Sequence, residues 1–205
     1  MPEAAALLLD LDGTLVDSEG FHRQVFRNWF AARGWPVSEE VLAGFTGRRA
    51  DDVLAHSSGP WTGEDVQVML AELLAGMAAL PRPELATGAA ALIAGTGVPL
   101  GLVTSANTAW ARTCLGDLLD AFAVVVTRDD VTDGKPHPEP YRLACELLGV
   151  APSDCVAVED APAGVASAVA AGIGTVVAVA GTFTAEQLAE AHKIVDTLDA
   201  VPALL

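Results

Sequence analysis

The chain has 205 residues, of which 52% are hydrophobic and 19% are charged, so it is not a disordered chain and has enough apolar material for a sizeable core. Its 27 acidic and 11 basic side chains give a formal net charge of −16. Since nucleic-acid binders usually carry a basic face, we expect no nucleic-acid partner. A small anionic substrate stays compatible with this charge, because a site can be locally positive.

The N-terminal segment Met1-Pro2-Glu3 has no basic residue of the kind that begins a signal peptide. The apolar run at residues 4–9 is too short to span a bilayer. The cysteines form no CxxC pair and lie in apolar stretches, which predicts buried, reduced thiols at Cys114, Cys145 and Cys155. We therefore expect a cytoplasmic protein without membrane contact.

The first predicted element is a short strand at residues 5–9, a continuous apolar run of the kind found in strands buried on both faces. The segment that follows contains no clear strand. An apolar stripe predicts a helix over residues 18–33, and the polar residues 62–65 can cap a second helix that carries apolar residues from 66 to 77.

Strands and helices alternate over the rest of the chain. The predicted strands cover residues 98–103, 123–126, 155–158, 175–179 and 194–195, and the predicted helices cover residues 89–94, 109–119, 139–148 and 163–171. This alternation predicts the α/β class with a doubly wound parallel sheet. We expect an α/β core made of residues 1–16 and 84–205, with a small α-helical cap of residues 17–83 inserted after the first strand.

Polar side chains gather where the predicted strands end. Open parallel sheets bind ligands at the carboxyl ends of their strands. The residues expected at this edge are Asp10, Asp12, Thr104, Ser105, Asn107, Lys135, Glu159 and Asp160. Lys135 stands out, because Lys193 is the only other lysine in the sequence.

Clustered carboxylates repel one another unless a cation neutralises them, and Mg²⁺ prefers oxygen ligands. Asp10 and Asp160 could hold such an ion, with Glu159 nearby. A carboxylate can attack a phosphoryl group and form an aspartyl phosphate, which makes Asp10 a candidate nucleophile. Asp12 could then act as the general acid and base.

Charge on a transferring phosphoryl group also has to be neutralised and its position fixed. The ammonium of Lys135, the hydroxyl of Thr104 and the backbone N–H of Ser105 are suited to that task. These side chains, the carboxylates and Mg²⁺ together predict phosphoryl-transfer chemistry, and a helical cap that encloses the site would favour a small phosphorylated metabolite as substrate.

The motifs Asp10-Leu-Asp-Gly-Thr14, Thr104, Lys135 and Glu159-Asp160 resemble, in order and spacing, those of the haloacid dehalogenase superfamily. The runs Gly134-Lys-Pro-His-Pro-Glu-Pro-Tyr141 and Val158-Glu-Asp-Ala-Pro-Ala-Gly164 resemble its β-phosphoglucomutase-like subgroup, which includes many sugar-phosphate phosphatases.

The resemblance covers essentially the whole chain and implies a role for each matching residue. Asp10 would be the nucleophile and a metal ligand, Asp12 the acid/base and a ligand through its backbone carbonyl, and Asp160 a further ligand. Thr104 and Lys135 would bind the transferring phosphate. The resemblance also implies a cap that closes over the site and excludes bulk water. A monomer suits such a cap, although the sequence leaves the oligomeric state undecided.

Four further residues are candidates for substrate binding. In the subgroup a histidine near the position of His22 can assist leaving-group chemistry or bind sugar, and a surface helix explains His22 nearly as well. Arg48 and Arg49 resemble part of the subgroup's specificity loop and could hold a second anionic or hydroxyl-bearing end of the substrate; they also suit an exposed helix start. Asn107 could touch the phosphate or the substrate.

The alternatives are a sugar phosphomutase, a dehalogenase or phosphonate hydrolase, and a non-catalytic phosphate-binding module. Subgroup mutases carry a cap lysine, and residues 17–83 contain none; arginine is not a free substitute. Asp12 argues against the second class, since family dehalogenases lack this aspartate and phosphonate hydrolases replace it. The complete set of reactive residues argues against the third. We therefore expect a phosphatase acting on a sugar or polyol phosphate, with phosphoglycolate and nucleoside monophosphates as other possible substrates.

Overall fold

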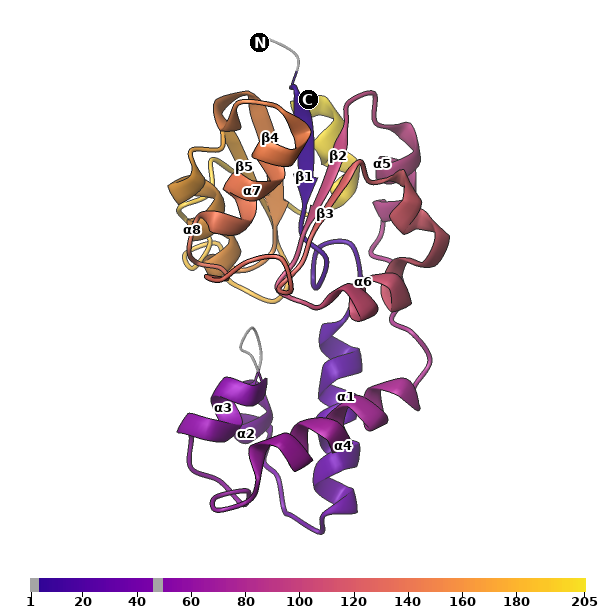
Figure 1. Ribbon diagram of the computed structural model, residues 1–205, viewed down its shortest axis with the longest axis vertical. Coiled ribbons are helices and arrows are strands. Elements are labelled where there is room, and N and C mark those ends of the chain that lie inside the picture. Colours follow the sequence, from indigo (N-terminus) through magenta and orange to yellow (C-terminus); the bar gives the residue numbers. More distant parts are fainter. Residues whose placement is uncertain (1–3, 46–49) are drawn as a thin grey trace. The chain divides into compact units, whose positions relative to one another are not determined.

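The computed structural model describes residues 4–45 and 50–205. The chain divides into two compact units, drawn in Figure 1. The α/β unit comprises Met1–Asp17 and Glu84–Leu205, and the helical unit comprises Ser18–Pro83. The helical segment follows the first strand, as the sequence predicted.

The α/β unit is built on a parallel sheet, which has six strands within the described residues, in the order β3-β2-β1-β4-β5-β6. The strands are β1 (Ala6–Leu9), β2 (Leu100–Val103), β3 (Val124–Val126), β4 (Cys155–Glu159), β5 (Thr175–Val179) and β6 (Lys193–Val195). Since β1 lies between β2 and β4, the residues that follow these three strands become neighbours at one edge.

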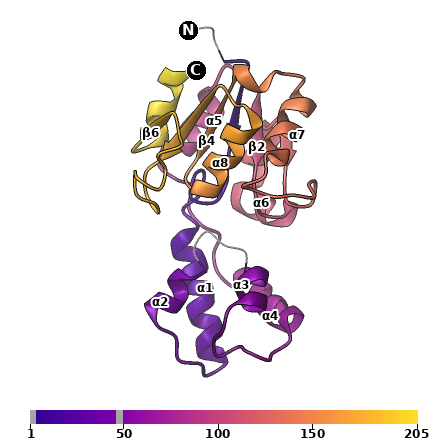
Figure 2. The same cartoon turned by 90° about the vertical axis from the view of Figure 1, so that its left-hand side faces the viewer.

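Helices cover both faces of the sheet (Figure 2). They are α5 (Ala89–Gly95), α6 (Thr108–Leu115), α7 (Glu139–Leu148) and α8 (Pro162–Ala171), with 3₁₀ turns η1 (Gly116–Ala121), η2 (Pro152–Asp154) and η3 (Leu198–Leu204). Leu7 and Leu9 of β1 pack with α5, α6, η1 and η3. Ala6 and Leu8 point to the other face, towards α7 and α8. Because both faces of β1 are covered, the sequence of this strand is apolar throughout.

The predicted strands and helices of the α/β unit are confirmed with small shifts at their ends. One helix differs more. Residues 109–119 were expected to form a single helix, whereas α6 stops at Leu115 and a 3₁₀ turn follows. Gly116, with a φ of 54° and a ψ of −129°, adopts a conformation open mainly to glycine, and the α-helix ends there.

The helical unit contains α1 (Glu19–Ala32), α2 (Glu39–Ala43), α3 (Ala50–His56) and α4 (Val66–Ala78). Its core is aromatic: Phe30 is fully buried and its ring lies 5.8 Å from that of Trp61, centroid to centroid. The side chain of Asp65 caps α4 by accepting from the backbone N–H groups of Gln67 and Val68. The short helix α2 was not predicted, and α3 begins beside the position where an exposed helix start was one of two interpretations.

An ion-pair group joins α1 to α4. Arg33 donates to both carboxylate oxygens of Glu72, at 2.8 and 2.9 Å, and the indole N–H of Trp29 donates to the same carboxylate at 2.8 Å. Bidentate, charge-assisted hydrogen bonds of this kind fix the orientation of α1 relative to α4 and also add stability.

The chain leaves the α/β unit and returns to it at neighbouring points. The backbone N–H of Asp17 donates to the carbonyl of Glu84 at 2.9 Å, and Val16 forms an antiparallel bridge with Leu85. The two connecting segments therefore run side by side where they meet the α/β unit.

Two sequence expectations concern the chain as a whole. Cys114, Cys145 and Cys155 are buried thiols, as predicted. Within the described residues, no helix combines the length and apolarity needed to cross a membrane.

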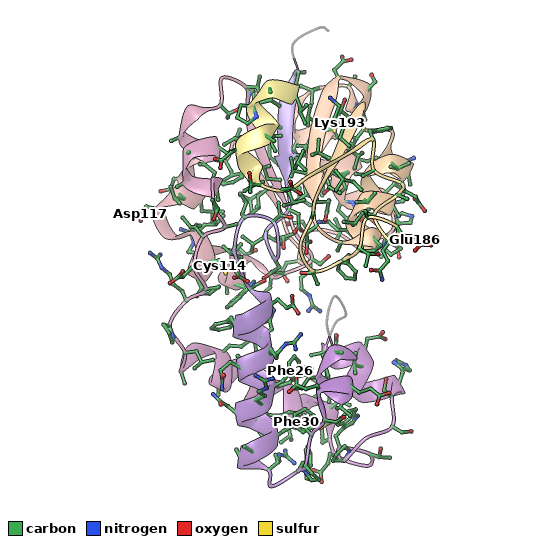
Figure 3. The ribbon with its side chains drawn as sticks, turned by 180° about the vertical axis from the view of Figure 1, so that it is seen from behind. Phe26, Phe30, Cys114, Asp117, Glu186 and Lys193 are labelled. Atoms are coloured by element: carbon green, nitrogen blue, oxygen red, sulfur yellow. The ribbon has the colours of Figure 1, made fainter. Side chains whose placement is uncertain are left out.

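We predict that Phe30→Ala destabilises the helical unit by about 3–5 kcal/mol, because it leaves a cavity among packed rings. Phe30 is labelled in Figure 3. Urea unfolding followed by tryptophan fluorescence measures this change, since Trp29, Trp35 and Trp61 all lie in this unit. The control is Leu74→Ala, which truncates a side chain that is 57% exposed and should change stability by about 0.5 kcal/mol or less. Equal losses in the two variants would contradict the assigned core.

Candidate active site

Asp10 is the first residue after β1 and is fixed by the sheet. Its backbone N–H donates to the carbonyl of Val158 in β4 at 3.0 Å, which continues the strand pairing by one residue. The residue is only 7% exposed. A carboxylate thus stands at the carboxyl end of the central strand, where the sequence placed it.

The turn after Asp10 lies against Asp160, the residue that follows β4. Gly13 has a φ of 82°, and its N–H donates to the carbonyl of Val16 at 2.9 Å. A Cβ at Gly13 would lie 2.1 Å from the Oδ2 of Asp160. Glycine is therefore required both by the backbone conformation and by the approach of the Asp160 carboxylate.

Lys135 joins the carboxylates into one group. Its ammonium donates to Asp10 Oδ1 at 2.7 Å, to the carbonyl of Val103 at 2.8 Å and to Glu159 Oε1 at 2.5 Å. Its side chain is 5% exposed, so these contacts replace almost all its hydration. An ammonium has three N–H donors, and these three contacts use each of them. The predicted convergence of Asp10, Lys135 and Glu159 is present in the structure.

Glu159, fully enclosed in the core, has a second partner that the sequence analysis did not single out. The hydroxyl of Tyr141 in α7 donates to its Oε1 at 2.5 Å. Gly164 makes room for this carboxylate, since a Cβ there would lie 2.0 Å from its atoms. Tyr141 and Gly164 both fall within motifs quoted above, yet only the fold shows what each contacts.

The carboxylates of Asp10, Glu159 and Asp160 lie close enough for one ion: a ligand atom from each falls within 4.8 Å of the others. Burial, followed by the charge of Glu159, raises the pKa of Asp10 to about 7 against the opposing effect of Lys135. Burial and the charges of Asp10 and Glu159 raise the pKa of Asp160 to about 8. Burial and the neighbouring carboxylates thus disfavour the ionised forms of these acids despite the lysine, and a divalent cation bound by oxygen ligands, which would stabilise the ionised forms, fits this donor set.

The ammonium of Lys135 responds in the opposite sense. Burial lowers its pKa, but the charges and hydrogen bonds of Asp10 and Glu159 outweigh that effect, and the net pKa is raised. Lys135 therefore stays positively charged throughout the neutral pH range.

The loop after β2 holds the next group of predicted residues. The hydroxyl of Thr104, a buried residue, accepts from the backbone N–H of Ala106 at 3.0 Å, and Ser105 beside it is exposed. The side-chain oxygen of Asn107 accepts from the backbone N–H of Trp110 at 2.8 Å. Asn107 is thus the N-cap of α6, a use that the sequence analysis did not consider.

Asp12 has a partner that no sequence motif indicated. The indole N–H of Trp110 donates to its Oδ1 and Oδ2, at 3.0 and 3.2 Å. The carboxylate of Asp12 is not part of the three-carboxylate cluster around Lys135. The two acidic groups of the first motif therefore have different surroundings, one beside an ammonium and the other beside an aromatic N–H.

The remaining predicted residues belong to the part of the chain between Asp17 and Glu84. His22 lies in the first turn of α1, half-buried, with its ring edge-on to Phe21 at 5.8 Å. Arg48 and Arg49 lie outside the described residues. Their expected contacts with substrate stay predictions.

Comparison with known proteins agrees with this geometry. A family model described as haloacid dehalogenase-like hydrolase matches residues 4–172. Validoxylamine A 7'-phosphate phosphatase from Streptomyces hygroscopicus subsp. limoneus is 41% identical over 95% of this chain and 94% of its own. Hexitol phosphatase A from Escherichia coli (strain K12) is 38% identical over 95% of this chain and 91% of its own.

A solved structure resembles the whole fold. CbbY from Rhodobacter sphaeroides, as a mutant in complex with xylulose-(1,5)bisphosphate, has a TM-score of 0.79 and 29% identity, over 95% of this chain and 94% of that one. With sheet order, motif residues and relatives in agreement, the chain belongs to the haloacid dehalogenase-like hydrolases, in the subfamily related to β-phosphoglucomutase.

Proposed function

We propose that this protein is a Mg²⁺-dependent phosphatase that hydrolyses a phosphate monoester of a small sugar or polyol through an aspartyl-phosphate intermediate. The observation that carries the proposal is the buried carboxylate of Asp10, held at 2.7 Å by the ammonium of Lys135 and flanked by Asp160. Relatives that act on validoxylamine phosphate and hexitol phosphates support the substrate class.

The proposed cation would be held by the carboxylates of Asp10 and Asp160 and by the backbone carbonyl of Asp12, with Glu159 nearby. It would supply positive charge for the phosphoryl oxygens and would stabilise the ionised forms of the crowded acids, whose pKa values burial and neighbouring carboxylates raise despite Lys135. Lys135 and the hydroxyl of Thr104 would bind the remaining phosphoryl oxygens.

Two displacements at phosphorus complete the proposed reaction. First, a carboxylate oxygen of Asp10 forms a bond to phosphorus while the bond to the ester oxygen breaks, and protonated Asp12 gives its proton to that departing oxygen. Second, Asp12, now a carboxylate, takes a proton from a water molecule as the water oxygen attacks phosphorus. The acyl phosphate bond breaks, inorganic phosphate leaves, and Asp10 and protonated Asp12 are restored.

A phosphomutase would use the same first step but transfer the phosphoryl group back to a sugar hydroxyl. The lack of lysine between residues 17 and 83 favours hydrolysis, since subgroup mutases carry one there. The named phosphatases among the relatives support the same choice.

The first test is phosphate release from hexitol phosphates, sugar phosphates, phosphoglycolate and nucleoside monophosphates. We expect release that needs added Mg²⁺, stops on treatment with EDTA and returns when Mg²⁺ is restored, with a hexitol or sugar phosphate as the best substrate. Conversion of glucose 1-phosphate to glucose 6-phosphate with little free phosphate would instead establish a mutase.

Asp10→Asn should lower kcat at least about a thousandfold, since an amide oxygen does not replace the carboxylate as nucleophile. Circular dichroism and thermal unfolding should show that the variant remains folded. The control is Asp117→Asn, which makes the same exchange at an exposed residue of η1, labelled in Figure 3, and should retain wild-type turnover. Substantial activity in Asp10→Asn would exclude the proposed nucleophile.

Gly164→Ala should lower kcat by about a hundredfold, because its new methyl group displaces Glu159 and with it Lys135, and small misplacements at a reacting centre are costly. Overpacking should also cost about 1–3 kcal/mol of stability. Kinetics and thermal unfolding measure the two effects. Gly95→Ala is the matched control, since nothing lies within 4 Å of the added Cβ in α5. Wild-type kinetics in Gly164→Ala would show that Glu159 does not position Lys135.

A further inference from the structure

The carboxylate of Asp12 receives one N–H donor on both of its oxygens. The indole Nε1 of Trp110 lies 3.0 Å from Oδ1 and 3.2 Å from Oδ2, and both residues belong to the α/β unit. A hydrogen bond to a charged acceptor is stronger than one between neutral groups, and a donor shared by both oxygens restricts rotation of the carboxylate.

Trp110 is itself held in place from two sides. It lies in the first turn of α6, where its backbone N–H donates to the capping oxygen of Asn107 at 2.8 Å. Its half-buried ring packs against the core cluster between the sheet and α5 and α6. The indole N–H therefore projects from a rigid part of the molecule.

The backbone on the other side of the contact is equally constrained. Asp12 forms a parallel bridge with Val16, and Gly13 donates to the carbonyl of Val16 at 2.9 Å. Because its main chain is fixed, the half-buried side chain of Asp12 can move mainly by rotation about its own side-chain bonds. The contact with Trp110 restricts that rotation.

We propose that Trp110 is a positioning residue that holds the carboxylate of Asp12 in the orientation for proton transfer. This inference rests on the proposed function, in which Asp12 donates a proton to the departing ester oxygen and later accepts one from water. Trp110 exchanges no proton itself, since indole is a donor only. A carboxylate has about four acceptor sites, so one shared N–H leaves sites on Asp12 for the transferred proton.

The contact is tested without reference to activity by NMR of the tryptophan indole N–H groups. The Trp110 signal is identified by its loss in Trp110→Phe, which keeps an aromatic ring and removes the donor. Replacing Asp12 by Asn should shift that signal and leave those of Trp29, Trp35 and Trp61 in place. An unmoved Trp110 signal would overturn the inference, whatever the enzyme hydrolyses.

The positioning role is tested by a double-mutant cycle on phosphate release. Trp110→Phe should lower kcat about tenfold with KM changed less than about twofold, since the loss falls on proton transfer and not on binding. In an Asp12→Asn background the same change should alter kcat less than about twofold, because the carboxylate on which Trp110 acts is already gone. A purely structural effect of Trp110 would instead be similar in both backgrounds.

Trp29→Phe is the matched control, since it removes an indole N–H that donates to a carboxylate, that of Glu72, in the helical unit. Trp29→Phe should lower stability, but its effect on kcat should not depend on whether Asp12 or Asn is present at position 12. Equal losses of kcat from Trp110→Phe in both backgrounds, or a kcat that rises, would overturn the inference. Absence of phosphate release by the wild-type enzyme would refute the proposed function separately, and the NMR measurement would still decide the contact.

Discussion

Three acidic side chains and one ammonium are buried together at the carboxyl edge of the sheet, and the contacts around them replace the water that these charges would otherwise need. Lys135 bonds Asp10 and Glu159 directly, and Asp160 adds a further carboxylate close by. Buried charges are tolerated only when they are paired and hydrogen-bonded. Tyr141 and the space beside Gly164 complete the enclosure of Glu159, and a bound cation would supply the charge that one lysine lacks.

The sheet order is what brings these groups together. Asp10 follows the central strand β1, Glu159 ends its neighbour β4, and the carbonyl of Val103 at the end of β2 accepts from Lys135. Residues far apart along the chain thus meet because parallel strands end at a common edge. The chemistry depends on few residues, while the apolar strands behind them set the distances.

Much of this could be predicted from the sequence, because buried parallel strands leave continuous apolar runs and their ends mark the site. The strand β5 matches its prediction at both ends, and Asp10, Lys135 and Glu159 meet as expected. Short helices such as α2 carry too few residues for a periodic pattern to be visible. Asn107, a candidate for contact with the substrate, also caps a helix three residues away, a local pairing that its residue type suits. The link between Trp110 and Asp12, by contrast, joins positions 98 residues apart. No local pattern encodes such tertiary pairings.

The paired connections at Asp17 and Glu84 have an evolutionary consequence. Because the chain departs from the sheet and rejoins it at adjacent, hydrogen-bonded residues, the intervening helices form a detachable insertion whose ends are already close together. Exposed junctions of this kind tolerate exchange of whole inserted segments. Residues 18–83 can therefore vary or be exchanged as a block, while the acidic centre and its supporting strands are inherited intact.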